Sequence, residues 1–377
     1  MKPMTPHTDR RWLALIILCL GDLMIVLDST IVNVALPSIK LDLAFTESTL
    51  VWMINGYMLT YGGFLLFGGR LGDFYGNRRM YLAGIVLFTL ASLVCGLPQS
   101  QQMLVIARAI QGLGGAVVST VALALIINQF TEEHERARAV VIFGFVMAGG
   151  GSVGVLLGGV LTGTLSWHWI FLVNIPVGIV VYILCIKLLP SDQGQPGVRI
   201  DIAGSLTITT SLMLAVYAIV NGNESGWLSA QTVILLVVAA ALLAIFLIIE
   251  SRVQQPLMPL ALFRFRNIAL ANIVSVLWAA AMFAWFFITA LYLQQVLGYT
   301  PMQVGLSFLP SNLIMAAFSL GLSASLVMRY GISLPIVIGL VLTALGLGLF
   351  AVAPVDGDFL LHVLPECCCW VRVLVWP

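Results

Sequence analysis

Long apolar stretches recur along most of the chain and are separated by short connectors that carry most of its charges. Each stretch has about 20 residues, the length that an α-helix needs to cross a bilayer, and none shows the alternation of a membrane β-barrel strand. Hydrophobic residues make up 60% of the sequence and charged residues 9%, against about 25% charged residues in soluble domains. We therefore predict an all-α polytopic membrane protein.

The apolar pattern predicts eleven transmembrane helices. The first carries Asp22 and Asp28 inside its apolar run, so we interpret it as a retained helix and not as a cleaved signal peptide. Pro37 is expected to end this helix. The eleven expected spans cover residues 12–35, 49–68, 79–97, 103–127, 138–161, 169–189, 201–220, 231–249, 267–296, 302–328 and 332–353.

Basic residues are divided very unequally between the two sets of connectors. With the N-terminus inside, Lys40 is the one basic residue of an outer connector. Basic residues near span ends stay on the cytoplasmic side, so the division predicts a multi-pass protein of the cytoplasmic (inner) cell membrane with a cytoplasmic N-terminus. The basic residues assigned to the cytoplasmic side are Lys2, Arg10, Arg11, Arg70, Arg78, Arg79, Arg136, Arg138, Lys187, Arg199, Arg252, Arg264, Arg266 and Arg329.

The connector between the second and third expected helices has the sequence GGRLGDFYGNRR, residues 68–79. So few residues predict a tight turn at the membrane edge, and its glycines would let helices approach closely. Gly69, Asp73, Gly76, Arg78 and Arg79 are the candidate residues of a conformational gate here.

Asp28 is the first candidate for chemistry inside the membrane. An ionisable side chain within a span costs roughly 2.5 to 3.5 kcal/mol on insertion scales, so it is a functional hypothesis by default. Removal from water favours the uncharged acid, which could take and release a proton as water access changes. A bracing role against a neighbouring helix is the alternative. Asp22 lies on another face of the same helix, and we expect it to be water-facing or to line the cytoplasmic mouth of a substrate cavity.

Arg108 is the second candidate, because arginine keeps its charge in proteins and would act as a fixed positive group beside a carboxyl. The alternative is a structural anchor for a helix kink. Gly112, Gly115 and Ser119 follow on the same helix face and predict close packing against a neighbour. Gly150, Gly154 and Gly158 form a similar seam in the fifth expected helix, compatible with a static pair or with sliding helices. Asn33 and Gln111 complete the substrate-cavity candidates with Asp22.

These motifs together resemble one family. LDSTIVNVALP (residues 27–37), the 68–79 connector, the Arg108 to Gly115 stretch and WHWIFLVNIPVG (residues 167–178) resemble the major facilitator superfamily, in particular its fourteen-span drug:proton antiporters of the QacA and EmrB type. The later stretches LFRFRN and LQQVLGYTPMQVGLSFLP fit the same branch. Phe74 departs from it, because a basic residue is common at that position.

The resemblance implies a fold and an activity. About eleven complete helices of an expected fourteen would be present: an N-terminal six-helix half (1–189), two extra helices with their loops (190–266) and part of a C-terminal half (267–364). It implies proton-coupled multidrug efflux by alternating access, with lipophilic or cationic substrates exported in exchange for protons. Asp28 and Arg108 would couple transport to the proton gradient, with no cofactor and no metal.

Other expectations concern partners and function. Beyond substrates, protons and membrane lipid we expect no partner: a net charge of +1 argues against nucleic acid, and we expect a monomer. No catalytic residues stand out, so an enzyme is not predicted. The alternatives are an exporter of an endogenous metabolite or lipid, and a non-transporting truncated remnant.

The last residues, 365–377, do not read like the rest. One allowed coding of residues 366–372 (ECCCWVR), read two bases later, gives Met-Leu-Leu-Leu-Gly-Thr, so we predict a frameshift near Pro365 and a cysteine triplet without a metal role. We accordingly expect impaired transport by the chain as it stands.

Overall fold

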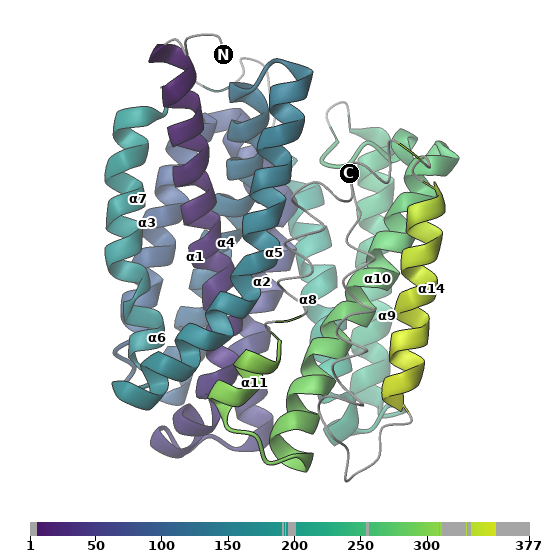
Figure 1. Cartoon of the computed structure of the whole chain (residues 1–377). Helices are drawn as coiled ribbons and strands as arrows, with labels where there is room; N and C mark the ends of the chain where they lie inside the picture. The colour runs from purple at the N-terminus through teal and green to yellow at the C-terminus, as the bar shows by residue number, and fades with distance from the viewer. Residues whose placement is uncertain are drawn as a thin grey trace. The chain divides into compact units, whose positions relative to one another are not determined.

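The computed structural model of the chain describes residues 6–190, 192, 194, 201–253, 256–308, 310, 329 and 333–351. Helices dominate this part of the chain, and no strand occurs in it (Figure 1). The helices are α1 (Pro6–Asp42), α2 (Glu47–Tyr75), α3 (Asn77–Cys95), α4 (Gln101–Gln129), α5 (Glu133–Thr164), α6 (Trp169–Leu172), α7 (Asn174–Leu188), α8 (Ile202–Ser225), α9 (Ala230–Arg252), η1 (Leu260–Arg264), α10 (Arg266–Leu291), η2 (Tyr292–Val296), α11 (Pro301–Ser307) and α14 (Ser333–Ala351).

Within the described residues, eight helical segments are long and apolar enough to cross a membrane, and they coincide with the first eight predicted spans. The protein is therefore a multi-pass membrane protein. Of the last three predictions, 267–296 corresponds to α10 followed by η2, and 332–353 corresponds to α14. Most of 302–328 and the whole tail from 365 to 377 lie outside the described residues.

Helix contacts divide the chain into two compact units. Unit 1 comprises residues 1–25, 36–136 and 171–266; unit 2 comprises residues 26–35, 137–170 and 267–377. Helix α1 thus contributes its middle to unit 2 and both its ends to unit 1. The division of the chain into halves and linker helices by sequence stays a prediction.

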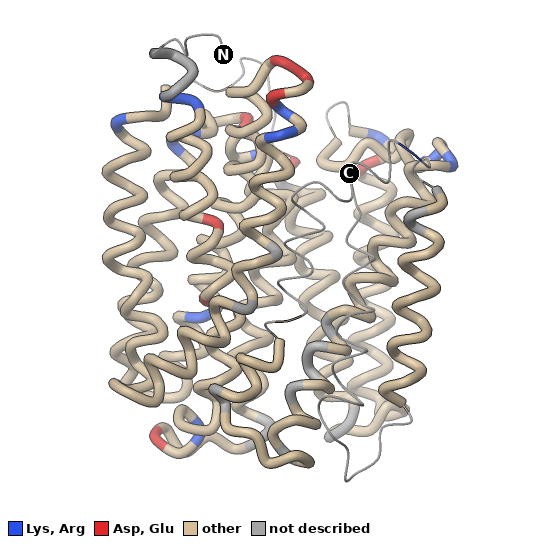
Figure 2. The backbone as a smooth tube through the Cα atoms, in the orientation of Figure 1, with Lys and Arg blue, Asp and Glu red and all other residues tan. Residues whose placement is uncertain are grey.

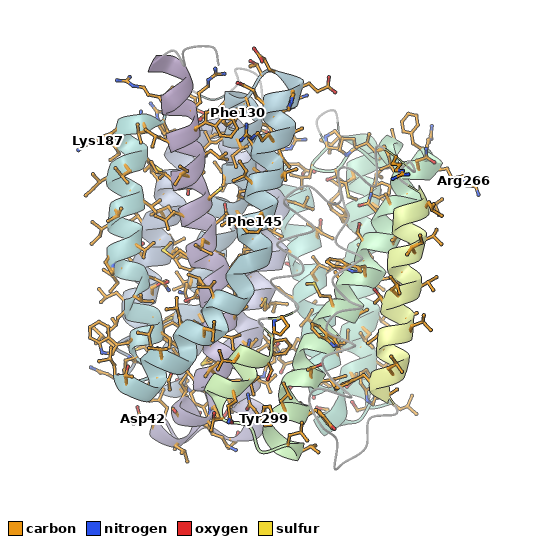
Figure 3. The ribbon with its side chains drawn as sticks, viewed as in Figure 1. Asp42, Phe130, Phe145, Lys187, Arg266 and Tyr299 are labelled. Carbon is orange, nitrogen blue, oxygen red and sulfur yellow. The ribbon has the colours of Figure 1, made fainter. Side chains whose placement is uncertain are left out.

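In unit 1, α4 packs against α2 and α3, α3 also packs against α7, and α8 pairs with α9. Helix α1 begins at the end of this unit where Phe130 and Lys187 lie and finishes at the opposite end, at Asp42 (Figure 3). The Trp12 ring packs against Phe130 there, with ring centroids 4.9 Å apart. The helices therefore run the full depth of the unit and bring residues from α1, α2, α3, α4 and α7 to its interior.

Unit 2 has its own apolar cluster. Trp285, Leu293, Val304 and Phe308 are each at most 3% exposed and pack together. The rings of Trp285 and Phe308 meet edge to face, with centroids 5.6 Å apart. These residues come from α10, η2 and the segment around α11, so the packing holds η2 and the α11 segment against α10.

Polar residues begin several of the helices. Thr46 accepts a hydrogen bond from the Thr49 amide at 3.2 Å, and Ser100 accepts one from the Met103 amide at 3.2 Å. Such caps satisfy amides that have no partner within the helix. The predicted end of α1 at Pro37 is wrong: the helix continues to Asp42 with Pro37 inside it, because proline removes one backbone bond without forcing the remaining bonds to break.

Most charged residues lie at the ends of the helices, and few lie along their lengths (Figure 2). The buried exceptions within spans include Asp22, Asp28 and Arg108, which are 0%, 0% and 1% exposed. Burial of an ionisable group in a lipid-spanning fold is costly unless its neighbours compensate. These three residues and their surroundings therefore define the candidate functional site.

Candidate functional site

Arg108 lies in the first third of α4 and is held by groups from two helices. Its Nη1 donates to Gln111 Oε1 at 2.7 Å, one turn further along α4, and its Nε donates to the Met53 carbonyl of α2 at 3.4 Å. The guanidinium also lies 4.1 Å from the ring centroid of Tyr57. Hydrogen bonds and an aromatic face both favour a cation, so the site is built to hold a permanent positive charge away from water.

Gln111 extends this contact to two further helices. Its Nε2 donates to Ser92 Oγ of α3 at 2.8 Å, and the same Oγ accepts from Asn174 Nδ2 of α7 at 3.4 Å. Ser92 in turn donates to the Phe88 carbonyl at 2.8 Å. The sequence analysis missed Ser92 and Asn174, although a buried amide or hydroxyl inside an apolar span is a usable signal, since such groups need partners.

Small residues bring α2 and α4 into close contact beside Arg108. A Cβ on Gly112 would overlap Thr60 Oγ1 and the Tyr57 carbonyl, and one on Gly115 would lie 3.3 Å from the Tyr61 ring. Thr60 Oγ1 donates across this contact to the Ala109 carbonyl at 2.7 Å. The predicted close packing of the Gly112 and Gly115 face is confirmed, and α2 is the partner.

Asp28 belongs to the part of α1 that lies in unit 2. Its side chain is 0% exposed. The neighbouring hydroxyls of Ser29 and Thr30 both donate to the Val26 carbonyl, at 2.8 and 3.0 Å. Asn33, in contrast, is exposed, so its predicted place in a substrate cavity is not supported by burial and stays a prediction.

The α5 glycine seam faces this part of α1. Gly150, Gly154 and Gly158 are buried. A Cβ on Gly158 would lie 2.8 Å from the Ile31 carbonyl, and one on Gly154 would lie 3.0 Å from the Leu27 carbonyl. The seam is therefore a backbone-to-backbone contact between α5 and α1, as the glycine spacing predicts for tight packing.

Asp22 differs from its predicted environment. Its side chain is 0% exposed, and its Oδ1 accepts a hydrogen bond from Ser119 Oγ of α4 at 2.6 Å. The expectation that Asp22 faces water is wrong, because α4 covers it. Gln111, the other predicted cavity residue of unit 1, contacts Arg108 and Ser92.

The predicted turn between the second and third spans is much shorter than 68–79. Helix α2 continues to Tyr75 and α3 begins at Asn77, so Gly69 and Asp73 are helical and Gly76 alone forms the turn, with φ of 96°. Hydrogen bonds along α2 satisfy most backbone amides and carbonyls of residues 68–75. Only glycine adopts the φ of the turn without strain. Gly68 and Gly72 pack against α4, which confirms close helix approach.

Asp192, in the segment after α7, binds the backbone directly after this turn. Its carboxylate accepts from the amides of Asn77 at 2.5 Å and Arg78 at 3.0 Å, two amides of the first turn of α3. Arg78 Nη2 also donates to the Ile186 carbonyl of α7 at 2.6 Å, whereas Arg79 is exposed. A carboxylate at a helix N-terminus is favoured by the helix dipole. The start of α3 in the candidate gate is thus hydrogen-bonded to α7 and to the segment that follows it.

Arg70 and Asp73 of α2 complete the surroundings of the turn. Arg70 Nη1 lies 3.8 Å from Asp73 Oδ2, and Arg70 Nη2 donates to the Pro256 carbonyl. Glu250 of α9 accepts from the amides of Leu257 and Met258 at 3.1 and 3.2 Å, which orders the same connector. Two connectors that are remote in sequence therefore contact this region: the segment after α7 binds the start of α3, and the connector after α9 binds Arg70 of α2.

Replacing Asp192 with alanine is expected to loosen this turn. The α3 amides of Asn77 and Arg78 lose their acceptor, at a cost of about 0.5 to 2 kcal/mol for a lost helix cap. Hydrogen–deuterium exchange should become faster in the peptide spanning residues 74–80. Glu132→Gln, at an exposed position before α5, is the control and should leave that peptide unchanged. Equal exchange in the Asp192→Ala variant and the unmodified chain would refute the capping role.

The fold and the buried polar groups define a helical membrane protein of the transporter type, and comparison with known proteins agrees. Residues 18–375 match the family model of the Major Facilitator Superfamily. The chain belongs to this superfamily, whose members are transporters and not enzymes.

Two relatives are named for drug resistance. The chain is 39% identical over 359 residues to the puromycin resistance protein pur8 of Streptomyces alboniger, which covers 94% of the chain and 71% of that protein. It is 40% identical over 335 residues to the multidrug resistance protein Stp of Mycobacterium tuberculosis (strain CDC 1551 / Oshkosh), which covers 89% of the chain and 62% of that protein. The chain thus spans between 62% and 71% of the length of these relatives.

A solved structure shows the same fold. The proton:xylose symporter XylE, bound to 6-bromo-6-deoxy-D-glucose, superposes with a TM-score of 0.62 at 15% identity, over 98% of this chain and 82% of that chain. At this identity the likeness concerns the fold alone. It agrees with the predicted major facilitator fold.

Proposed function

We propose that this protein is a proton-coupled multidrug exporter that works by alternating access as an antiporter of the fourteen-span type. It would take up small lipophilic or cationic compounds from the cytoplasm and exchange them for inward-moving protons, with no cofactor beyond the proton gradient. The N-terminus would lie in the cytoplasm and the protein in the cytoplasmic (inner) membrane. The names of the two resistance proteins support drugs as the substrates.

The observation that carries the proposal is the burial of Asp28 and Arg108 within apolar membrane-spanning helices. A carboxyl group changes charge when it binds a proton, whereas a guanidinium does not. In an exchanger these are complementary roles: Asp28 alternates between acid and carboxylate, and Arg108 supplies a constant positive field. An ionisable group inside a lipid-spanning helix is costly, which makes both residues candidates for a functional role.

The contacts of Arg108 support this division of roles. Its hydrogen bonds to Gln111 and Met53 fix the guanidinium to α4 and α2. Movement of either helix would therefore shift a fixed charge. The α2 to α3 turn, with Asp73, Arg78 and Arg79, would govern when the transporter opens to the cytoplasm, because Arg78 and the α3 amides are tied to neighbouring segments.

Transport in inside-out membrane vesicles tests the proposal. The vesicles contain the chain, are prepared from a strain without its own drug pumps and are energised to an acidic interior. A fluorescent cationic drug should accumulate inside to a reduced but measurable extent, in keeping with the impaired transport expected of the chain. Its addition should partly dissipate the pH gradient, because each drug molecule enters in exchange for protons that leave. Vesicles without the chain are the control. Accumulation that persists after an uncoupler removes the gradient would contradict proton coupling.

Asp28→Asn is the informative variant of the same assay, since asparagine has a similar shape and cannot release a proton. We expect drug binding to remain measurable while drug-dependent proton movement is lost. Proton movement equal to that of the unmodified chain would remove Asp28 from the coupling role.

A further inference from the structure

Asp22 is a buried carboxyl group that has one side-chain hydrogen bond and no ion pair with the described residues. Its Oδ1 accepts from Ser119 Oγ at 2.6 Å, and its Oδ2 is buried without any hydrogen-bond partner among the described residues. Arg11 pairs with Glu135 and Arg70 pairs with Asp73, and neither of these ion pairs involves Asp22. The group therefore lacks the compensation that a buried negative charge needs.

The titratable groups that face Asp22 from the helices around it are hydroxyls and thiols. Cys19 lies on the same helix, Tyr61 comes from α2 and Tyr81 from α3, and each interacts with Asp22. Cys185 of α7 interacts electrostatically with Tyr81. These groups are neutral at physiological pH, so the surroundings offer Asp22 hydrogen-bonding atoms without offering a positive charge.

Arg108 does not serve as the counter-ion. It lies eleven residues before Ser119 on α4, which is about 16 Å along the helix axis at 1.5 Å per residue. Two stacked aromatic rings connect the two places: Tyr57 lies 4.1 Å from the guanidinium, and Tyr61, with its ring centroid 5.9 Å from that of Tyr57, interacts with Ser119. Asp22 and Arg108 are therefore ends of one chain of contacts and not an ion pair.

We propose that Asp22 and Ser119 form a second proton-binding site, distinct from Asp28, in which Asp22 rests as an uncharged acid. An uncompensated buried carboxylate neutralises by taking up a proton, because the buried charge costs more than a buried acid with one hydrogen bond. Ser119 donates to Oδ1, which leaves Oδ2 as the atom that carries the proton. When water reaches the site, Oδ2 gives this proton to a water molecule, and water then solvates the carboxylate that remains.

Infrared spectroscopy of the purified chain tests the site without any transport. At neutral pH the unmodified protein should show the carbonyl stretch of a protonated carboxylic acid, and Asp22→Asn should lose that contribution. Ser119→Ala should keep the band but move it to higher frequency, since the hydrogen bond to Oδ1 is gone. Asp28→Asn is the matched control and should keep the Asp22 band. An unchanged band in the Asp22→Asn variant would overturn the proposal.

The role of the site in transport rests on the proposed function and needs its own measurement. In the vesicle assay, Asp22→Asn should still exchange drug for protons but move fewer protons per drug molecule than the unmodified chain. An unchanged proton count would refute the transport role. If the unmodified chain moves no protons with drug, the proposed function fails, whereas the infrared band still decides whether Asp22 holds a proton.

Discussion

Replacing Arg108 with glutamine is expected to abolish proton-coupled drug transport, the largest functional effect of any single substitution proposed for this chain. The substitution removes the fixed charge and the donors to Gln111 Oε1 and the Met53 carbonyl. Hydrogen bonds to a charged group contribute about 1.5 to 3 kcal/mol each, so the α2 to α4 contact also weakens. Drug accumulation in inside-out vesicles, normalised to the amount of protein in the membrane, measures the effect.

Arg108→Lys separates charge from geometry. Lysine keeps the positive charge but has no planar fork with which to reach both acceptors and lie over Tyr57. We expect strongly reduced transport together with a normal amount of protein. Arg252→Lys, at an exposed position at the end of α9, is the control and should transport like the unmodified chain. Full transport activity in the Arg108→Gln variant would show that Arg108 has no role in proton coupling.

Gly112→Ala is expected to cause the largest loss of stability. The added methyl group would overlap Thr60 Oγ1 and the Tyr57 carbonyl, and a backbone atom cannot move aside as a flexible side chain can. Overpacking typically costs about 1 to 3 kcal/mol, and here it would also push Tyr57 away from Arg108. We expect a lower midpoint of thermal unfolding in detergent and less protein in the membrane.

Gly62→Ala is the matched control for this prediction. Gly62 lies in α2, faces away from the interior and has open space where a Cβ would be. Alanine is favoured over glycine inside a helix by about 1 kcal/mol, so this variant should be as stable as the unmodified chain or more stable. If Gly112→Ala and Gly62→Ala have the same midpoint of thermal unfolding, the tight contact between α2 and α4 does not exist in the detergent-solubilised protein.

The transmembrane helices could be predicted from sequence because lipid imposes one rule on every segment. A span needs about 20 apolar residues whatever its neighbours are, so local composition is sufficient. Helix ends were predicted less well. Pro37 lies inside α1, and α2 continues through Gly69 and Asp73 to Tyr75. Both errors have the same cause, since residues that weaken a helix do not end it while most backbone bonds remain possible.

The candidate site was predicted only in part. Arg108, Gln111 and the glycines beside them stand out as a charge and small residues inside one apolar helix. Ser92 and Asn174 are polar residues inside apolar spans, but their partners lie far away in sequence and could not be predicted. Asp192 does not stand out, because its role depends on a contact with the start of α3. Asp22 was placed in water by its position on the helix alone, and the packing of α4 over it is a tertiary fact that one helix cannot reveal.

Gly76 has a mechanical consequence. A connector of several residues can absorb rotation between two helices through its many backbone torsions, but a single residue offers only one φ and ψ pair. With φ held at 96° and the next two amides bound by Asp192, α2 and α3 are joined almost rigidly. We therefore expect that a rotation of α2 about its own axis also rotates α3, so that the two helices move together.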